Sequence, residues 1–312
     1  MGNGMNFDLT DDQEALRDGI RALCDGRFGV ERVRGGFDRS MWDELAETGV
    51  FSLIADGFGW ADAAIAFEEL GRAVVPGPLV WGVLAHGVVD GIVGGLERPA
   101  DGVAMVEHLD FIDALVAIDD GGAARIDPVS LSGAERLDWP LDFLTPVARV
   151  ASLPAGEPVA DGATVGAWRR QGAVLTAAFQ AGMAARCVEM ATEYSLARKQ
   201  FDRPIGSFQA VKHLLADAVV RAEVARTAVH AAAVTLDDPG VGDVDRAIAG
   251  AKLLAGEAAL KNAKTSLQVH GGMGFTWEVD VHLYLKRAWV LDTVFGSAAA
   301  HADEIAAGLP SA

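Results

Sequence analysis

Hydrophobic positions in the first third of the chain recur at helical spacing. After Thr10, a residue type that caps helices, Leu16, Ile20 and Phe28 fall on roughly one face of a predicted helix. Further helices are predicted over MWDELAETG, WADAAIAFEELGRAV and the apolar run LVWGVLAHGVVDGIV. We therefore expect residues 1–95 to form an N-terminal helical domain.

From about residue 96 the pattern changes to short apolar runs separated by Gly, Pro and Asp. The runs GVAMVE, ALVAID and PVARVAS have the length of strands and are bounded by turn residues. This pattern predicts a small, reduced β-domain over residues 96–165.

Long helical patterns return in the last part of the chain. Each carries a broad face of Ala, Leu and Val, as is typical of an antiparallel bundle. The four predicted helices cover residues 167–197, 208–236, 243–269 and 279–307. The expected fold is thus α+β but mostly α, with a C-terminal four-helix bundle over residues 166–312.

Composition narrows the possible functions. The chain has 312 residues, enough for two or three packed units, and a formal net charge of −18, which disfavours nucleic acid and anionic membranes as partners. Its two cysteines lie far apart, which excludes a disulfide framework and suits a reducing compartment. The sequence has neither a leader pattern nor an apolar stretch of about 18 residues, so we expect a soluble cytoplasmic protein.

Common catalytic and metal motifs are missing from the sequence. No GxxxxGK[ST], HExxH or GxSxG pattern occurs, and the histidines lack the spacing of metal ligands. The run GGMGF follows a predicted helix and not a strand, so it is no Rossmann fingerprint. We expect no metal site.

Two segments, residues 197–219 and 268–297, combine an arginine, amide side chains and paired glycines near predicted helix ends. An arginine fork and bare glycine backbone are groups that can hold a pyrophosphate and its nucleoside. The same residues are also compatible with a surface arginine and two ordinary helix ends. The residues by themselves leave both interpretations open.

The two segments resemble the acyl-CoA dehydrogenases, whose C-terminal domain carries an R-x-x-F-G-x-x-I-x-x-x-Q and a Q-x-x-G-G-x-G-F pattern. The runs NFDLTDDQEALRD, WDELAETGVFSL and FEELGRAVVPGPL are similar to that family as well, so the resemblance covers nearly the whole chain. It implies a set of FAD-contacting residues: Arg198, Phe201, Ile205, Gln209, Gln268, Gly271 and Gly272, with Gly274 and Phe275 completing the second pattern.

The resemblance also implies a reaction, the α,β-dehydrogenation of an acyl-CoA thioester. In the family a carboxylate removes the α-proton while the β-hydrogen leaves as hydride to a flavin. Here Phe295 stands where the usual glutamate is expected, and a side chain of that kind cannot accept a proton. The alternative base position of some members, about Gly172, lies in residues 167–175, which contain no acid. Asp292 is the nearest carboxylate to Phe295 in sequence.

The predicted β-domain departs from the family too. Members that hold their own flavin carry T-E-P-x-x-G-S-D-like and W-I-T-N-like stretches, and residues 96–165 contain neither. Ala299 occupies the position of a further flavin-contacting glutamine. In the family, the retained residues are those that a subunit contributes to its neighbour's flavin, whereas the lost ones serve its own.

The resemblance therefore implies a heteromer. The expected partner is a second dehydrogenase-like subunit in an α2β2 assembly, which holds FAD, the catalytic glutamate and the acyl-CoA substrate, while this chain completes the FAD site. Similar short subunits occur in bacterial steroid side-chain β-oxidation. Two other hypotheses stay open: a homo-oligomeric flavoenzyme with a relocated base such as Asp292, and a non-enzymatic acyl-CoA-binding or scaffold protein.

Overall fold

The computed structural model describes residues 8–308 and separates them into two compact units that interleave along the chain. The first unit takes residues up to 30, residues 60–75 and residues from 173 onward, and the second takes residues 31–59 and 76–172. The boundaries expected from the sequence, near 95 and 165, divide the chain in sequence order. They stay a prediction.

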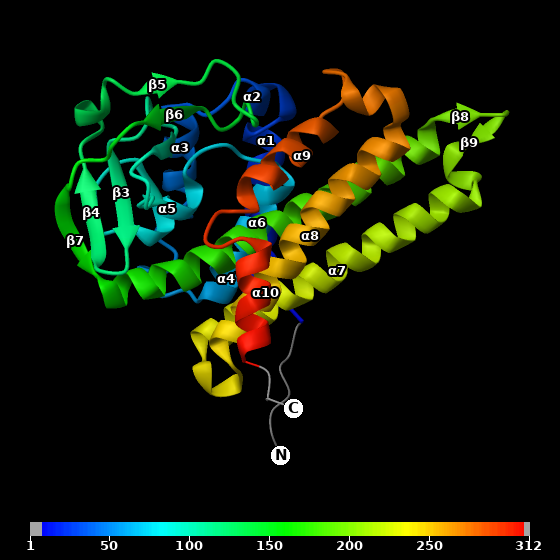
Figure 1. Cartoon of the computed structure of the whole chain (residues 1–312). Helices are drawn as coiled ribbons and strands as arrows, with labels where there is room; N and C mark the ends of the chain where they lie inside the picture. The colour runs from blue at the N-terminus through cyan, green and yellow to red at the C-terminus, as the bar shows by residue number, and fades with distance from the viewer. Residues whose placement is uncertain (1–7, 309–312) are drawn as a thin grey trace. The chain divides into compact units, whose positions relative to one another are not determined.

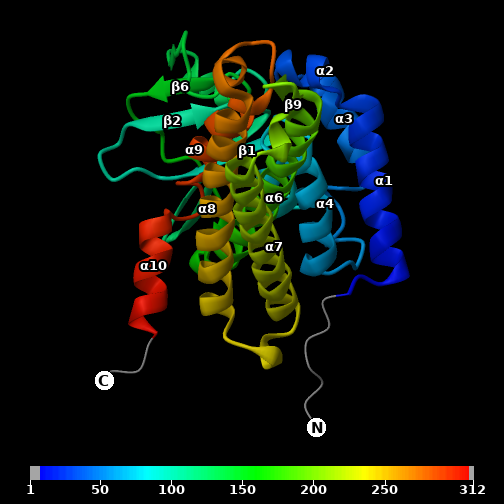
Figure 2. The same ribbon diagram turned by 90° about the vertical axis from the view of Figure 1, so that its right-hand side faces the viewer.

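The first unit is helical, and its longest helices lie side by side (Figures 1 and 2). Helix α7 packs along α8, and α8 also contacts α9 and α10, which gives the expected C-terminal bundle. The helices of this unit are α1 (Asp11–Arg27), α4 (Trp60–Arg72), most of α6 (Gly162–Ala197), α7 (Gln209–Asp237), α8 (Val244–His270), α9 (Val281–Leu291) and α10 (Ala298–Ala307).

Local sequence explains where α1 begins. The Thr10 hydroxyl accepts a hydrogen bond from the Gln13 backbone N–H, and the Gln13 side chain accepts one from the Thr10 backbone N–H, both at 3.2 Å. This reciprocal capping box satisfies donors that a helix start otherwise leaves unpaired. The predicted cap is confirmed.

Helices α4 and α6 approach each other so closely that two positions admit only glycine. A Cβ on Gly71 would overlap the backbone of Phe179, and a Cβ on Gly182 would overlap the carbonyl group of Glu68. Each glycine therefore packs against the backbone of the other helix. Residues 173–184 of α6 are all buried, as expected for a helix that is apolar all round.

A buried amide ties the three long helices together. Asn262 of α8, 1% exposed, donates from Nδ2 to the carbonyl oxygens of Ala184 in α6 and Ala218 in α7. Its Oδ1 accepts a hydrogen bond of 2.9 Å from Nε of Arg221. Because each group of this amide is paired, the helices are fixed in register as well as packed.

The second unit holds seven strands, in two small sheets. One sheet has the order β1-β3-β4-β7, in which only the β1/β3 pair is parallel, and the other has the order β2-β6-β5. The helices of this unit are α2 (Val30–Arg34), α3 (Arg39–Glu47) and α5 (Leu79–Leu84). Its strands are β1 (Val93–Glu97), β2 (Ala104–Glu107), β3 (Ala114–Asp119), β4 (Gly122–Ile126), β5 (Glu135–Arg136), β6 (Val147–Val150) and β7 (Glu157–Asp161).

The predicted helix over residues 79–93 is wrong in its second half. Helix α5 ends at Leu84, and the chain then turns and enters β1 at Val93. Gly87 and Gly91 have φ values of +75° and +88°, which end the helical conformation. The three strands predicted from GVAMVE, ALVAID and PVARVAS are present as β2, β3 and β6.

The last predicted helix, 279–307, is in fact two helices. Helix α9 ends at Leu291 and α10 begins at Ala298, where the Ser297 hydroxyl accepts a hydrogen bond from the Ala300 backbone N–H. The connection contains Phe295 at φ +53° and Gly296 at φ +101°, which no helix accommodates. Across residues 8–308, no helix combines the length and apolarity needed to cross a bilayer.

Candidate functional site

The two motif segments meet at one end of the helical unit. Tyr194, in the last turn of α6, stacks on His270, the last residue of α8, with ring centroids 4.3 Å apart and planes 29° from parallel. His270 is buried, and its Nδ1 lies 2.8 Å from the carbonyl oxygen of Ser266. This stack places the segment that begins at Arg198 and the turn that begins at Gly271 at the same end of the bundle.

The first motif forms a β-hairpin between α6 and α7, seen at the right in Figure 1. Strand β8 (Lys199–Gln200) pairs with β9 (Arg203–Pro204), and the Ile205 N–H donates to the carbonyl oxygen of Arg198 at 2.8 Å. The two turn residues, Phe201 and Asp202, have φ values of +53° and +64°. Positive φ at both central residues is the signature of a type I′ turn, which favours Asn, Asp and Gly.

Phe201 is therefore in an unfavourable backbone conformation, and its ring is also unburied. The residue is 87% exposed, and its ring makes an edge contact with Phe208 at 6.1 Å between centroids. Neither the turn geometry nor the burial gives the fold a reason to keep phenylalanine here. Asp202 occupies the position that the family pattern gives to glycine, and it is a residue type that tolerates the left-handed conformation.

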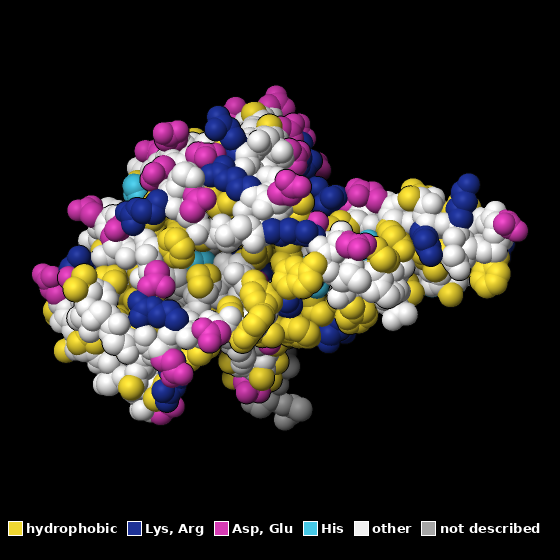
Figure 3. Space-filling model, turned by 90° about the horizontal axis from the view of Figure 1, so that it is seen from above, with side chains coloured by type: hydrophobic (Ala, Val, Ile, Leu, Met, Phe, Trp, Pro, Cys, Tyr) yellow, Lys and Arg dark blue, Asp and Glu magenta, His cyan; other side chains and the backbone are white. Residues whose placement is uncertain are grey.

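Basic side chains gather on this hairpin and the first turn of α7, in contrast to the acidic chain as a whole. Arg198, Lys199, Arg203 and Lys212 are opposed by a single acid, Asp202, between residues 198 and 212. Figure 3 shows basic and hydrophobic side chains together at the right of the view, where the hairpin lies. The guanidinium group of Arg203 lies over the ring of Phe208, 4.1 Å from its centroid.

The guanidinium of Arg198 is exposed, and within residues 8–308 it makes no hydrogen bond or ion pair. Two acids lie nearest to Arg198 in sequence. Glu193 accepts a hydrogen bond of 3.2 Å from Nη1 of Arg186 instead, and Asp202 makes no ion pair with Arg198. The backbone of Arg198 is held at both ends, because its N–H donates to Tyr194 and its carbonyl accepts from Ile205. A fixed backbone with a free cationic side chain is suited to an anionic ligand.

The second motif forms a turn at the end of α8, followed by a short 3₁₀ helix (Gly271–Phe275). Gly271 has φ +61° and ends α8, and a Cβ on Gly274 would lie 2.9 Å from the carbonyl oxygen of Leu267. Gly272 differs from Gly271 because its φ is not positive, and it differs from Gly274 because a Cβ on it would meet nothing within 4 Å. Two of the three glycines are explained by the fold, whereas Gly272 leaves open backbone facing solvent.

The other predicted residues lie on the same two segments. Gln209 is the exposed first residue of α7, and Ile205 is half-buried where the hairpin enters that helix. Gln268 is exposed in the last turn of α8, and its carbonyl oxygen accepts the Gly271 N–H. Phe275 is 80% exposed. Thus the seven predicted contact residues come from one end of the helical unit, but whether they contact FAD stays a prediction.

The turn expected to carry a catalytic base carries none. Nε2 of His301 lies 3.0 Å from the carbonyl oxygen of Phe295, and a Cβ on Gly296 would lie 2.5 Å from the same nitrogen. Asp292 lies close to Lys252 of α8, whose ammonium donates to the Leu291 carbonyl oxygen at 2.9 Å. On α6, residues 167–175 contain no carboxylate.

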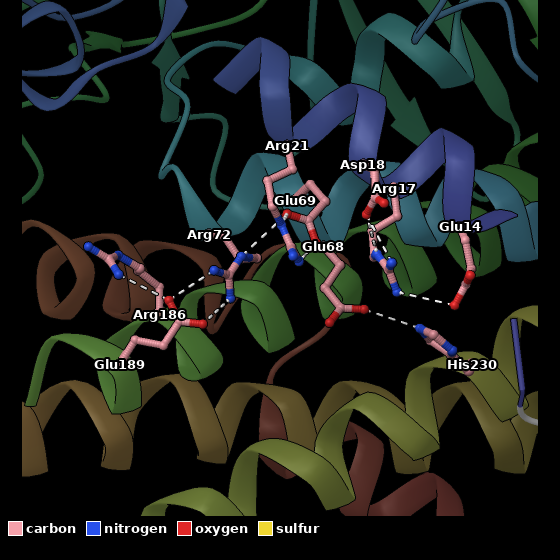
Figure 4. Close-up of polar contacts among 10 residues, drawn as sticks. All are labelled: Glu14, Arg17, Asp18, Arg21, Glu68, Glu69, Arg72, Arg186, Glu189 and His230. Atoms are coloured by element: carbon pink, nitrogen blue, oxygen red, sulfur yellow. Dashed lines mark hydrogen bonds and ion pairs between the residues drawn. The ribbon is translucent and has the colours of Figure 1, made fainter. Parts of the chain in front are cut away.

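A cavity of about 470 Å³ in the first unit borders a second group of charged residues (Figure 4). Glu69, 3% exposed, accepts hydrogen bonds from Nε and Nη2 of Arg21, and Arg72 binds Glu189 through both terminal nitrogens at 2.7 and 2.9 Å. Burial acts to raise the pKa of Glu189, but hydrogen bonds from Arg72 and Arg186 outweigh it and lower that pKa. These charges satisfy one another, so the network serves to join α1, α4 and α6.

The residues that support the motifs are not predicted from the sequence. Tyr194 and His270 shortly precede the two motifs in the chain, and that adjacency is the signal by which they could have been found. Gln180 and Lys252 lie buried in α6 and α8, and no local pattern marks them. Among residues 8–308, no cluster of three or more His, Cys, Asp or Glu side chains is placed to hold a metal ion.

Comparisons with known proteins agree with this geometry. Residues 170–309 match the family described as acyl-CoA dehydrogenase, C-terminal domain. One chain of the ChsE4-ChsE5 complex from Mycobacterium tuberculosis superposes with a TM-score of 0.81 and 25% identity, covering 98% of this chain and 100% of that one. The acyl-CoA dehydrogenase IpdE2 of Mycobacterium tuberculosis is 35% identical over 309 residues, which cover 89% of this chain and 91% of that protein.

The acyl-CoA dehydrogenase IpdE2 of Mycolicibacterium smegmatis is 33% identical over 304 residues, which cover 90% of this chain and 93% of that protein. Such identity over nearly the full length of both chains, together with the matched C-terminal domain, shows that this chain belongs to the acyl-CoA dehydrogenase family.

Proposed function

We propose that this chain is a non-catalytic subunit of a heteromeric FAD-dependent acyl-CoA dehydrogenase and that it completes the FAD site of an active partner subunit. The observation that carries the proposal is a contrast within the chain. The hairpin and the glycine turn keep exposed, ligand-type groups that the fold does not need, whereas the turn around Phe295 holds no base.

The groups at the end of α6 and α8 fit a flavin dinucleotide chemically. Arg198 offers a planar guanidinium without a competing acid, which suits the diphosphate. Gly272 offers backbone that a phosphate or sugar can approach, and exposed Phe201 offers an aromatic face. The amides of Gln209 and Gln268 can hydrogen-bond polar groups of the same ligand. The flavin, when bound, supplies the redox chemistry of α,β-dehydrogenation.

Phe201 supports the proposal because it lowers the stability of the folded chain. A phenylalanine in a left-handed conformation with 87% of its surface exposed weakens the folded chain relative to Asn or Gly. A residue retained against stability points to a contact made outside this chain. A cofactor or subunit packed on the hairpin would bury the ring and offset that cost.

The proposed partner is a dehydrogenase-like chain in an α2β2 assembly that contributes the catalytic glutamate and binds the acyl-CoA. Similarity to one chain of a two-component complex, ChsE4-ChsE5, favours a paired-subunit assembly over a homo-oligomer. The acyl group that we propose is bulky, of the steroid side-chain class, and this rests on the resemblance to paired-subunit dehydrogenases. The proposed location is the cytoplasm.

Flavin content distinguishes this proposal from its two alternatives. The full-length chain is purified alone and after co-expression, in turn, with each longer acyl-CoA dehydrogenase of the same organism, and FAD absorbance is measured against protein mass. We expect a colourless chain alone and one FAD per pair of unlike subunits in the complex. A yellow, active chain alone would instead support a homo-oligomer with a relocated base such as Asp292, and a complex whose FAD content does not depend on this chain would support a scaffold.

A further inference from the structure

A group of polar side chains lies between α6, α8 and the connection from α9 to α10, apart from the hairpin and the glycine turn. Its members are Gln180 of α6, Lys252 of α8 and Asp292, the residue that follows α9. Gln180 is 0% exposed, Lys252 is 2% exposed and Asp292 is half-buried. Burial as complete as that of Gln180 and Lys252 requires that their polar atoms find hydrogen-bond partners inside the protein.

The amide of Gln180 does not meet that requirement. Neither its Nε2 nor its Oε1 has a hydrogen-bond partner among residues 8–308, and the same holds for the hydroxyl of Thr176, one helical turn earlier. Buried polar atoms are nearly always paired, because an unpaired one loses its hydrogen bonds to water without replacement. Two adjacent turns of α6 therefore present unmet hydrogen-bonding groups.

Gly256 of α8 leaves room beside these groups. A Cβ at this position would lie 3.6 Å from Oδ1 of Asp292, 3.6 Å from Nε2 of Gln180 and 3.8 Å from Oε1 of Gln180. Those are ordinary contact distances, and φ at Gly256 is not positive, so neither sterics nor backbone conformation demands glycine. Lys252 lies one helical turn away on α8.

The chemistry of the group selects the occupant. It combines an ammonium, a carboxylate and an amide with a free donor and a free acceptor, so a bare anion or cation would meet a like charge. A small neutral molecule that both donates and accepts satisfies all of them. We propose that an ordered internal water occupies the space beside Gly256, bridges Gln180 to Asp292, and so fixes the start of the turn that contains Phe295.

Two glycine substitutions on α8 test the proposal, with the full-length chain and urea unfolding as the readout. A Cβ on Gly250 would meet nothing within 4 Å, so Gly250→Ala is the matched control and should raise the folding equilibrium constant roughly fivefold. Gly256→Ala gains the same helix propensity but displaces the water, and we expect it to be less stable than the unsubstituted chain. A Gly256→Ala variant that is equally stable or more stable overturns the proposal.

A second measurement covers the case in which Gly256→Ala does not fold. A crystal structure of the unsubstituted chain, at a resolution that shows ordered solvent, should contain water density within hydrogen-bond distance of both Gln180 and Asp292. A direct hydrogen bond between the two side chains, or a site without density, overturns the proposal.

Discussion

Nε2 of His301 lies 3.0 Å from the carbonyl oxygen of Phe295 and so links α10 to the turn that precedes it. The same imidazole packs against Gly296, where any Cβ would clash with it. Phe295 itself has φ +53°, a strained conformation that this contact helps to hold. The turn is therefore fixed by its own neighbours, and the side chain of Phe295 at its centre cannot take a proton.

The first prediction concerns Phe295. Because phenylalanine cannot act as a base, Phe295→Ala in the complex with the partner should leave turnover within a few-fold of the unsubstituted enzyme. Steady-state turnover with an acyl-CoA substrate measures this, and thermal unfolding reports any damage to the fold. A loss of several orders of magnitude in a folded complex would show that this turn borders a working active site.

Arg198 is expected to affect the retention of FAD. Charge-assisted arginine–phosphate contacts are strong, so Arg198→Ala should weaken FAD binding by the complex roughly ten- to a hundredfold. Lysine should restore only part of the affinity, because it keeps the charge but loses the planar fork. Flavin titration of the apo-complex measures the effect. The control is Arg226→Ala, another exposed arginine, and equal affinities in the two variants would contradict a role for Arg198.

Phe201 should show opposite effects on stability and on FAD. Asparagine tolerates the left-handed conformation, so Phe201→Asn should stabilise the isolated chain by roughly 0.5–1 kcal/mol. The same variant should weaken FAD retention or subunit association in the complex, since it removes the exposed ring. Urea unfolding of the chain alone and flavin titration of the complex give the two numbers. A gain in stability with unchanged binding would leave the ring without a function at the hairpin.

Two glycines of the second motif should differ in their effects, one on the stability of the chain and the other on FAD retention. Gly274→Ala should destabilise the chain by about 1–3 kcal/mol, because its methyl group would crowd Leu267. Gly272→Ala should leave unfolding nearly unchanged, because its methyl group would meet nothing, yet it should reduce FAD retention where ligand approaches the backbone. Urea unfolding of the chain and flavin titration of the complex measure the two effects. If Gly272→Ala has no effect on either quantity, this turn is only a helix end.

We expect the buried Lys252 to make the free energy of unfolding depend on pH. Burial lowers its pKa from 10.5 to about 8, an effect partly offset by the charge of Asp292. Since the unfolded chain then binds more protons between about pH 8 and 10.5, stability gains from this group as pH rises through that window, by at most about 1.4 kcal/mol per pH unit. Below about pH 8 the lysine is charged in both states, and its burial penalty is constant.

The substitution Lys252→Met should remove this dependence. The difference in unfolding free energy between the two chains should be constant up to about pH 8 and then shift in favour of the unsubstituted chain. Urea unfolding at several pH values measures it, with Lys264→Met, an exposed lysine of the same helix, as the control. A difference that stays constant from about pH 7 to 10 would contradict the lowered pKa.

Features that depend on neighbours in the chain could be predicted without a structure. The capping box at Thr10, the long helices of the bundle and strands β2, β3 and β6 follow from capping residues, periodicity and turn signals within a few positions. The two motif segments were also visible, because their arginine, glycines and glutamines are close together in sequence.

Other features depend on how whole helices pack, and local signals do not reveal them. The break in the helix predicted over 279–307 depends on positive φ at Phe295, a residue type that gives no such signal, and on its contact with His301. The stack of Tyr194 on His270 and the grouping of Gln180 with Asp292 join residues far apart in the chain. Such pairs form only when the helices are assembled, because close packing is a property of the folded unit and not of any short stretch of sequence.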